Sequence, residues 1–365
     1  MSKMRSSPDP WILVSTLLLL TIGVVMVYSA SAVLAFHDYG DYFYYLKRQL
    51  IFAVLGVAAM FVTMNVDYWV WKKYAKVGLI VCFALLVIVL IPGIGVVRGG
   101  ARSWLGIGSL GIQPSEFMKL GMIVFLSKLL SEEQSGITRF TTGLLPPLGI
   151  MGLAFGMIML QPDLGTGAVL VGASLLIIFT AGARMTHLGY LALVGVAGFV
   201  GLIAAAPYRL KRITAFLDPW QDPLGAGYQS IQSLYAIGPG GLAGLGLGMS
   251  RQKYSYLPEP QTDFIFSIIA EELGFIGGAT VLLLFALLVW RGMRTAITAP
   301  DSFGSLLAVG IVGMIAVQVI INIGVVIGMF PVTGITLPLI SAGGSSLTLM
   351  LTAIGVLLNI SRYAR

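Results

Sequence analysis

Residues 11–33 read WILVSTLLLLTIGVVMVYSASAV and hold no charged side chain. An α-helix needs about 20 apolar residues to cross the hydrocarbon core of a bilayer, so this run predicts a membrane-spanning helix. The run is longer than the roughly 7–15 residues of a signal-peptide apolar region, and Lys3 and Arg5 precede it. We therefore expect a retained first helix whose N-terminal end faces the cytoplasm.

The composition of the whole chain extends this interpretation. Of 365 residues, 57% are hydrophobic and 10% are charged, and the mean hydropathy is +0.94. A soluble domain carries about 25% charged residues. The deficit excludes a cytosolic enzyme, a disordered chain and a nucleic-acid partner, although the net charge is +7. The sequence predicts an all-α, polytopic membrane protein in contact with membrane lipids.

Further apolar runs predict nine more spans, at about 49–66, 77–97, 115–131, 143–160, 165–182, 187–206, 264–290, 304–328 and 337–360. About ten transmembrane helices then form one domain over residues 1–365. Starting inside, twelve of the 22 Lys and Arg residues fall in cytoplasmic segments and nine fall outside, five of these in one long loop. This bias favours a topology with both termini cytoplasmic.

Two predicted outer loops are not simple connectors. The first covers about 98–114 and contains Arg102 and Trp104, and the second covers about 207–263, between predicted helices 7 and 8. A loop this long usually has a function. The second loop is basic, with Arg212 among its cations, which suggests an anionic ligand such as a lipid-linked phosphate. The charge of the loop alone is equally consistent with a loop that binds no specific ligand and only contacts water or lipid headgroups.

The outer loop also contains a glycine-rich stretch, residues 238–248. This stretch lacks the Gly-Lys-Ser/Thr ending of a phosphate-binding P-loop and follows no predicted strand, so we expect no bound nucleotide. Glycines here suit a close backbone approach to a lipid or to another helix. The single cysteine, Cys82, and two distant histidines, His37 and His187, give no basis for a disulfide, a zinc site or Ser-His-Asp chemistry.

Ionisable residues in or beside the spans are the best indicators of function in a membrane protein. Glu116 and Lys119 lie three positions apart on one helix face, where they suit either a substrate site or a structural ion pair. Asp163 lies between the fifth and sixth spans and could equally cap the following helix.

Three carboxylates mark the start of the eighth span. Asp263 lies where the long loop ends, and Glu271 and Glu272 follow at about 80° and 180° around a continuous helix. Glu271 and Glu272 cannot then both face the same cavity as Asp263. Glu271 is the better candidate for the interior of the helix bundle. Either glutamate could instead pair with Lys119.

An outer carboxylate beside basic groups suits glycosyl transfer from a lipid pyrophosphate. The carboxylate can take the proton from a sugar hydroxyl as that hydroxyl attacks the anomeric carbon. Lysine, arginine or a divalent cation, Mg²⁺ or Mn²⁺, can offset the charge of the departing pyrophosphate. Asp263 is the candidate ligand of such a cation.

Several motifs resemble one family in order along the chain. They are MVYSAS at 26–31, RSW at 102–104, QPSEF at 113–117 with Lys119, QPDLGT at 161–166, LPEPQTDF at 257–264, EELG at 271–274 and SAGGS at 341–345. The chain resembles the shape, elongation, division and sporulation (FtsW/RodA/SpoVE) family of bacterial polytopic glycosyltransferases, and most resembles its sporulation branch.

The resemblance implies ten spans, cytoplasmic termini and polymerisation of lipid II into glycan strands in the bacterial cell membrane, and for the sporulation branch in forespore septum membranes. It implies a class B penicillin-binding protein as partner. Asp263 matches the essential carboxylate; Glu116, Lys119 and Asp163 would line its cavity, and Arg102 and Trp104 would border it. The remaining candidate substrate-binding residues are Arg212, Glu271, Ser341 and Ser345.

The sequence departs from the family at two positions. Ala342 stands where the family usually has tyrosine in Ser-Tyr-Gly-Gly-Ser, so a role of that ring is absent. Thr333 stands where division-type members often have lysine, which argues against that branch.

The leading hypothesis is an inverting peptidoglycan glycosyltransferase with lipid II as donor and acceptor and Asp263 as base. A lipid II flippase is the alternative, because Glu116, Lys119 and Glu272 would suit a polar path. The sequence shows no inverted repeat or matching pair of interrupted helices, which transporters commonly have. A third hypothesis is a non-catalytic scaffold for the transpeptidase.

Overall fold

The computed structural model describes residues 6–98, 101–107, 110–132, 137–204, 207–254 and 256–364. Lys3 and Arg5 lie outside these residues, as does the side chain of Arg212. The helices of the bundle are α1 (Pro10–Tyr39), α2 (Tyr44–Asn65), α3 (Tyr68–Leu90), α4 (Pro114–Glu132), α5 (Leu145–Met159), α6 (Leu164–Thr180), α7 (Met185–Ala204), α10 (Ile265–Ile297), α11 (Ser302–Val326) and α12 (Gly344–Ser361).

Each of the ten predicted spans corresponds to one of these helices. Among the described residues, seven segments are long and apolar enough to cross a membrane, and the helices at Leu164–Thr180 and Met185–Gly198 are shorter but apolar. The remaining one, α4, carries Glu116, Lys119, Lys128 and Glu132. The chain is a polytopic helical membrane protein. The predicted start of the third span, residue 77, is wrong because α3 begins at Tyr68.

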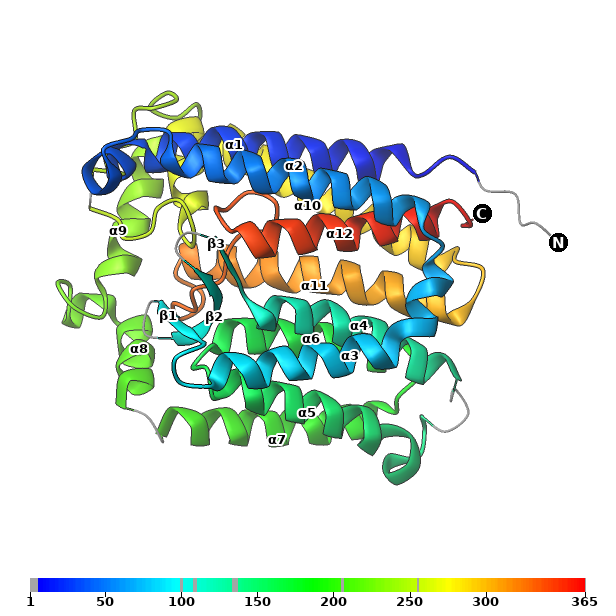
Figure 1. Cartoon of the computed structure of the whole chain (residues 1–365). Helices are drawn as coiled ribbons and strands as arrows, with labels where there is room; N and C mark the ends of the chain where they lie inside the picture. Colours follow the sequence, from blue (N-terminus) through cyan, green and yellow to red (C-terminus); the bar gives the residue numbers. More distant parts are fainter. Residues whose placement is uncertain are drawn as a thin grey trace.

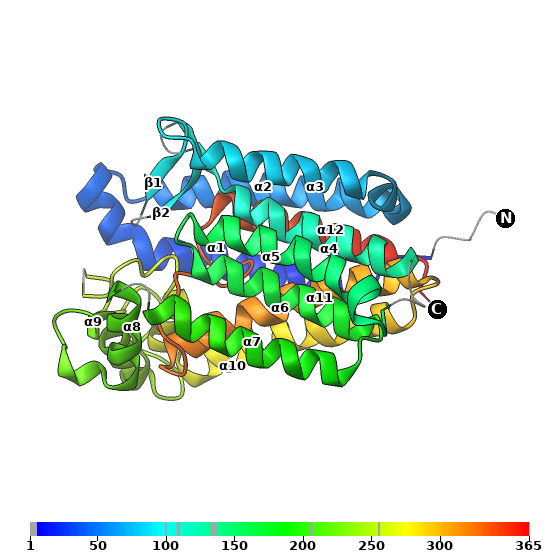
Figure 2. The same cartoon turned by 90° about the horizontal axis from the view of Figure 1, so that it is seen from below.

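Two helices form the centre of the bundle. α11 and α12 have 72% of their apolar windows buried, against 28% for α2 and α3. α11 packs against α4, α6 and α10, and α12 packs along α2. Figures 1 and 2 show the other helices around this centre, with α7 at one edge. The glycines allow this close packing: a Cβ on Gly355 would lie 2.4 Å from the carbonyl oxygen of Met60.

The end of the bundle opposite the two termini is built from the two long connections (Figure 1). The segment around the expected loop at 98–114 contains three antiparallel strands, β1 (Val96–Arg98), β2 (Ala101–Ile107) and β3 (Leu110–Ile112). β1 falls mostly within the predicted third span, whose end at residue 97 is wrong because α3 ends at Leu90. The 207–263 connection is also not an open loop. It contains α8 (Pro207–Leu217), the short η2 (Pro219–Gln221), α9 (Tyr228–Ile237) and the short η3 (Gly238–Gly240).

α10 is interrupted at Gly274, whose φ of 65° and ψ of −161° are not helical. The glycine-rich stretch lies against this break. Its Leu245 and Gly246 amides donate to the carbonyls of Glu271 and Glu272, at 2.9 and 3.0 Å. A Cβ on Gly244 would lie only 2.1 Å from the Glu272 carbonyl oxygen. The expected close approach to a helix backbone is therefore confirmed.

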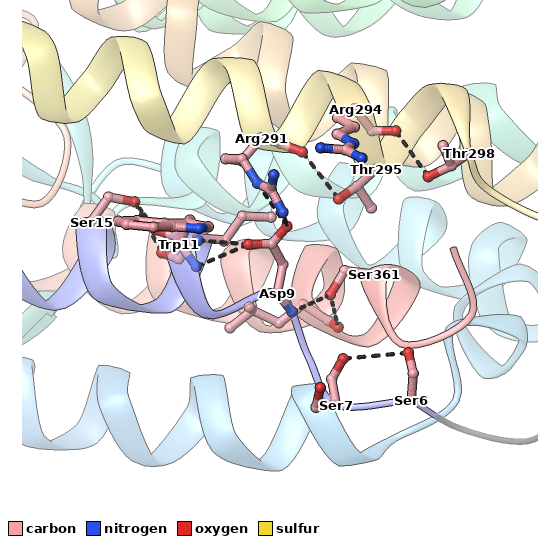
Figure 3. Close-up of polar contacts among 12 residues, drawn as sticks. Ser6, Ser7, Asp9, Trp11, Ser15, Arg291, Arg294, Thr295, Thr298 and Ser361 are labelled. Atoms are coloured by element: carbon pink, nitrogen blue, oxygen red, sulfur yellow. Dashed lines mark hydrogen bonds and ion pairs between the residues drawn. The ribbon is translucent and has the colours of Figure 1, made fainter. Parts of the chain in front are cut away.

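The termini meet at the other end (Figure 3). Asp9 caps α1 by accepting from the amides of Trp11 and Ile12, and its second oxygen accepts from Arg291 Nε of α10 at 2.9 Å. The Asp9 amide donates to the Ser361 hydroxyl of α12 at 3.0 Å. Asp9 therefore joins α1, α10 and α12. A short π-helix, η1 (Phe140–Leu144), precedes α5 near this end.

Candidate functional site

A cavity of about 480 Å³ opens at the end that carries the strands and α8–α9. Its walls come from β2, α4, the α5–α6 turn, the 257–264 motif, α11 and the connection between α11 and α12. Five residues predicted to form the site line it: Trp104, Glu116, Lys119, Asp163 and Asp263.

Glu116 and Lys119 form a buried ion pair in the first turns of α4. Their charged atoms are 2.9 Å apart, and their side chains are 8% and 3% exposed. Lys119 also donates to the Gln318 side chain of α11 at 3.1 Å. The pair therefore has a structural role between α4 and α11 while it lines the cavity. The interpretation that Glu271 or Glu272 pairs with Lys119 is wrong.

Asp163 caps α6 and also faces the cavity. One carboxylate oxygen accepts from the Thr166 amide at 3.0 Å, and the other accepts from the Gln113 side chain at 3.0 Å. Burial is the largest influence on this carboxyl group and raises its pKa, against the hydrogen bonds from Thr166. The expected N-cap and the expected cavity position are both present.

Asp263 is held at the cavity by its backbone. The Asn322 side chain of α11 donates to the Asp263 carbonyl at 2.8 Å and to the Ile335 carbonyl at 2.7 Å. The Ser341 hydroxyl donates to the carbonyl of Thr262 at 2.6 Å. Gly334 faces the Asp263 carboxylate, because a Cβ built on it would lie 3.7 Å from Oδ2. These contacts fix the backbone that carries the carboxylate, between α10 and the α11–α12 connection.

The two candidate serines support this frame and do not line the cavity. The Ser341 hydroxyl accepts from the Leu337 amide at 2.8 Å in addition to its bond to Thr262. The Ser345 hydroxyl donates to the Gly111 carbonyl at 3.1 Å and accepts from the Gln113 amide at 3.3 Å. Both side chains are buried and hold neighbouring backbone segments together beside the cavity.

Arg102 also lies away from the cavity lining, although Trp104 reaches it. Arg102 pairs with Val97 in the sheet, and its side chain lies over Gly95. The sequence expectation treated this segment as a loop, in which neighbouring side chains can share one side. Ala101 and Ser103 of β2 line the cavity and Arg102 between them points to the other face, as alternation in a strand requires. Trp104 reaches the cavity as well because the pairing with β1 shifts register between Val96 and Val97, which are opposite Trp104 and Arg102.

Glu271 belongs to a separate buried cluster. Its carboxylate accepts from the Ser250 hydroxyl at 2.6 Å and from the Arg251 amide at 2.8 Å. Glu272 accepts from Ser29 of α1 and forms an ion pair with Lys253 at 3.1 Å. Both glutamates are at most 1% exposed. The cluster joins α1, the outer segment and the break in α10, and it lies outside the cavity lining.

Comparisons with known proteins identify the family. The chain matches the family described as "Cell cycle protein" (FTSW_RODA_SPOVE) over residues 10–365. The chain belongs to the FtsW/RodA/SpoVE family. It is 63% identical to "Stage V sporulation protein E" of Bacillus subtilis over the full length of both chains. It is 45% identical to "Probable peptidoglycan glycosyltransferase FtsW" of Trichlorobacter lovleyi, with 97% of this chain and 93% of that protein covered.

Two solved structures share the fold of this FtsW/RodA/SpoVE member. One, described as "Structural coordination of polymerization and crosslinking by a peptidoglycan synthase complex", has a TM-score of 0.80 at 33% identity and covers 97% of this chain and 98% of its own. The rod shape determining protein RodA of Thermus thermophilus has a TM-score of 0.71 at 29% identity, with 97% of both chains covered. The family resemblance inferred from the motifs is confirmed.

The structure adds polar residues of this family member that the sequence reasoning missed. Gln113, Gln318 and Thr336 line the cavity, and Asn322 holds the backbone beside it. Gln318 and Asn322 are one helical turn apart in the otherwise apolar α11. Such amides inside a span normally bond across helices, so their spacing was a usable signal.

The described cavity lining is rich in carboxyl groups. Four carboxylates line it, those of Glu116, Asp163, Glu259 and Asp263, with Lys119 as the one described cation. Lys119 is already paired with Glu116. Ala342 also lines the cavity, at the position where the family usually has a tyrosine ring.

Proposed function

We propose that this protein is a peptidoglycan glycosyltransferase that polymerises lipid II at the outer face of the cell membrane. The observation that carries the proposal is the fixed position of Asp263 in a cavity of ligand size, in a chain of the FtsW/RodA/SpoVE family. The relatives named as peptidoglycan glycosyltransferases support the reaction class.

Asp263 acts as general base in the proposed reaction. Its carboxylate takes the proton from the attacking sugar hydroxyl of the acceptor as the hydroxyl oxygen bonds to the anomeric carbon of the donor. The bond between that carbon and the lipid pyrophosphate breaks, and the pyrophosphate leaves with the electron pair. Direct attack inverts the configuration at the anomeric carbon. Asn322 and Ser341 act as positioning residues, because their hydrogen bonds fix the backbone around Asp263.

A divalent cation, Mg²⁺ or Mn²⁺, fits this arrangement. No group of three acidic, histidine or cysteine side chains that could hold a metal occurs among the described residues. Mg²⁺ is commonly bound by one or two carboxylates together with substrate phosphates, so Asp263 could serve as its protein ligand. A cation bound there would offset the repulsion between the acidic groups of the lining and an anionic pyrophosphate. We expect chelation with EDTA to suppress polymerisation and either metal to restore it.

The proposed partner is a class B penicillin-binding protein, which would crosslink the strands. The similarity to a chain of a peptidoglycan synthase complex supports this proposal. Both termini lie at the end of the bundle away from the cavity, which supports a cytoplasmic position for both (Figure 1). The identity to a stage V sporulation protein suggests a role in spore-cortex synthesis at forespore septum membranes.

A lipid II flippase remains the second candidate because α10 is interrupted at Gly274. Interrupted helices commonly carry the substrate site of a transporter, usually as a matching pair in the two halves of the fold. The break in α10 is bonded to residues 241–246 rather than exposed to the cavity. This arrangement favours a structural break over a transport path.

Purified protein in complex with its transpeptidase partner, supplied with lipid II and Mg²⁺, tests the proposal. Asp263→Asn should lower the polymerisation rate by about 10²-fold or more, because the general base is lost. Asp38→Asn, an exposed aspartate of α1 at the same end, is the control and should polymerise normally. A wild-type rate in Asp263→Asn refutes the catalytic assignment. Translocation of lipid II in liposomes without polymer would favour the flippase.

A further inference from the structure

A second chamber of about 390 Å³ lies beside the Asp263 cavity. Its described lining comes from the end of α8, the segment before α9, the first turn of α9, Pro258 and Val332. None of these residues belongs to a segment that is long and apolar enough to span the membrane. The chamber therefore lies on the water side of the bundle, whereas the first cavity reaches down to residues of α4 and α11.

The two chambers share walls. Gln229 and Val332 line both of them. One motif also faces both chambers, because Pro258 lines the second and the next residue, Glu259, lines the first. Glu259 has a φ of +49°, in the left-handed region that non-glycine residues rarely adopt. The chain therefore passes from the wall of the second chamber to the wall of the first at this strained residue.

The chemistry of the second chamber differs from that of the first. No acidic or basic side chain occurs in its described lining, whereas four carboxylates and an ammonium line the first. Phe216 and Tyr228 offer aromatic rings, and Gln229 and Ser230 offer hydrogen-bonding groups. Such a wall fits an uncharged ligand that has both apolar surface and hydroxyl or amide groups.

Among the parts of a lipid-linked glycan precursor, one fits these observations. The polyprenyl chain belongs in the hydrocarbon core, which the lining residues of this chamber do not span. The pyrophosphate and the peptide stem are charged, and the described lining of this chamber offers no charge to compensate them. N-acetylated sugar rings are neutral and carry both apolar surface and polar groups.

We propose that the second chamber is a binding site for a neutral N-acetylhexosamine unit of the glycan, next to the bond formed at Asp263. This inference rests on the proposed function, since it assigns the substrate portion that occupies this part of the site. The shared wall of Gln229 and Val332 would then align the bound sugar with the Asp263 cavity.

Binding of chitotetraose, a neutral β-1,4-linked N-acetylglucosamine tetramer, tests the assignment without turnover. The full chain in nanodiscs is titrated and the dissociation constant is followed by saturation-transfer NMR. Ala226, an exposed residue of the chamber wall, allows a bulky substitution at the surface. We expect Ala226→Trp to weaken binding by about tenfold or more, because the ring occupies space in which the sugar would be buried. Phe216→Ala should also weaken binding, because it removes a ring of the wall.

Matched variants separate this inference from the proposed function. Ala243→Trp places the same ring on an exposed outer residue that lines neither chamber, and Asp38→Asn alters an exposed residue outside both linings, so both should bind as wild type does. Wild-type affinity in both Ala226→Trp and Phe216→Ala overturns the inference, as does a wild-type protein that binds farnesol or the free stem peptide there but not the tetramer. Chamber-dependent sugar binding without polymerisation would refute the proposed function alone.

Discussion

The ion pair between Glu116 and Lys119 is shielded from water, and both residues line the proposed active site. Removing one partner leaves the other charge buried and uncompensated. We expect Lys119→Met to lower the free energy of unfolding by about 3–5 kcal/mol. The double variant Glu116→Gln/Lys119→Met should recover most of that loss, because no isolated charge remains. Thermal unfolding of the single and double variants in the same detergent measures both effects.

The same double variant decides between the two readings of the pair. A purely structural pair can be replaced by neutral side chains without loss of polymerisation. We expect the double variant to polymerise lipid II much more slowly than wild type at equal foldedness, because Lys119 is the one described cation of the cavity. A stable double variant with the wild-type rate would contradict a role of the pair in substrate binding.

Asp163 should give stability a distinctive pH dependence. Burial raises its pKa in the folded protein above the ordinary value of about 3.9, so the folded state binds this proton more readily than the unfolded chain. The contribution of protonated Asp163 to stability is complete below the pKa that this group has in the unfolded chain. It is lost as pH rises through the pKa that the group has in the folded protein. Asp163→Asn cannot ionise and still caps α6.

The stability of Asp163→Asn relative to wild type should therefore increase as pH rises through this window and then level off. Melting temperatures of both proteins, recorded in parallel from pH 3 upward, measure the difference and cancel the titration of shared groups. A difference that stays constant with pH would show that Asp163 has no raised pKa in the folded state.

The break in α10 depends on the absence of a side chain at Gly274. A Cβ there would lie 2.3 Å from the Gly244 amide nitrogen and 2.6 Å from the Leu242 carbonyl oxygen, and the positive φ adds strain. Gly274→Ala should destabilise the protein by at least about 1–3 kcal/mol and release residues 238–248 from α10. Melting temperature and protease cleavage of the outer segment measure these effects.

Gly278 provides the control on the same helix. A Cβ there would meet Phe266 Cζ at 3.5 Å, an ordinary contact, and the residue has no positive φ. Gly278→Ala should have the melting temperature and the protease resistance of the wild type. Equal effects of the two substitutions would show that the break is not what holds the outer segment.

The sequence predicted the spanning elements because a run of apolar residues determines a membrane helix almost alone. It missed the first turns of α3, where Tyr68 and Lys72 lie, because polar and aromatic residues interrupt the apolar pattern there. It also placed Glu271 and Glu272 on a continuous helix, where adjacent residues point about 100° apart. In the structure Glu272 contacts α1 and Glu271 contacts residues 250–251, so surrounding segments bury both sides of the helix.

At the scale of the whole molecule, the site residues that the sequence could identify are those whose charge is costly in a membrane. Glu116, Lys119, Asp163 and Asp263 come from three distant parts of the chain, and the fold brings them to one cavity. The second chamber could not be predicted in this way. Phe216, Tyr228 and Pro258 are unremarkable in an outer loop, and only the packing of α8 and α9 brings them together.

A substitution at the end of the bundle near the termini should change stability without changing activity. The Asp9–Arg291 contact and the Asp263 cavity lie at opposite ends of the bundle (Figure 1). α1 alone is about 45 Å long, from 30 residues at about 1.5 Å each. Asp9→Asn retains the helix cap and removes the ion pair, whose side chains are only 10% and 18% exposed. We expect a loss of about 1.5–3 kcal/mol in stability, typical of a hydrogen bond to a charged group.

Polymerisation by Asp9→Asn should keep its wild-type rate and KM well below the melting temperature, since the substitution leaves the outer cavity intact. Arg291→Met should show the same pattern, and the two together should be less than additive because they remove one contact. Glu132→Gln is the control: its ion pair with Lys72 spans 3.6 Å and is partly exposed, so stability should change by less than about 1 kcal/mol. A changed KM in Asp9→Asn at unchanged melting temperature would instead mean that the inner contact among α1, α10 and α12 is coupled to the site across the membrane.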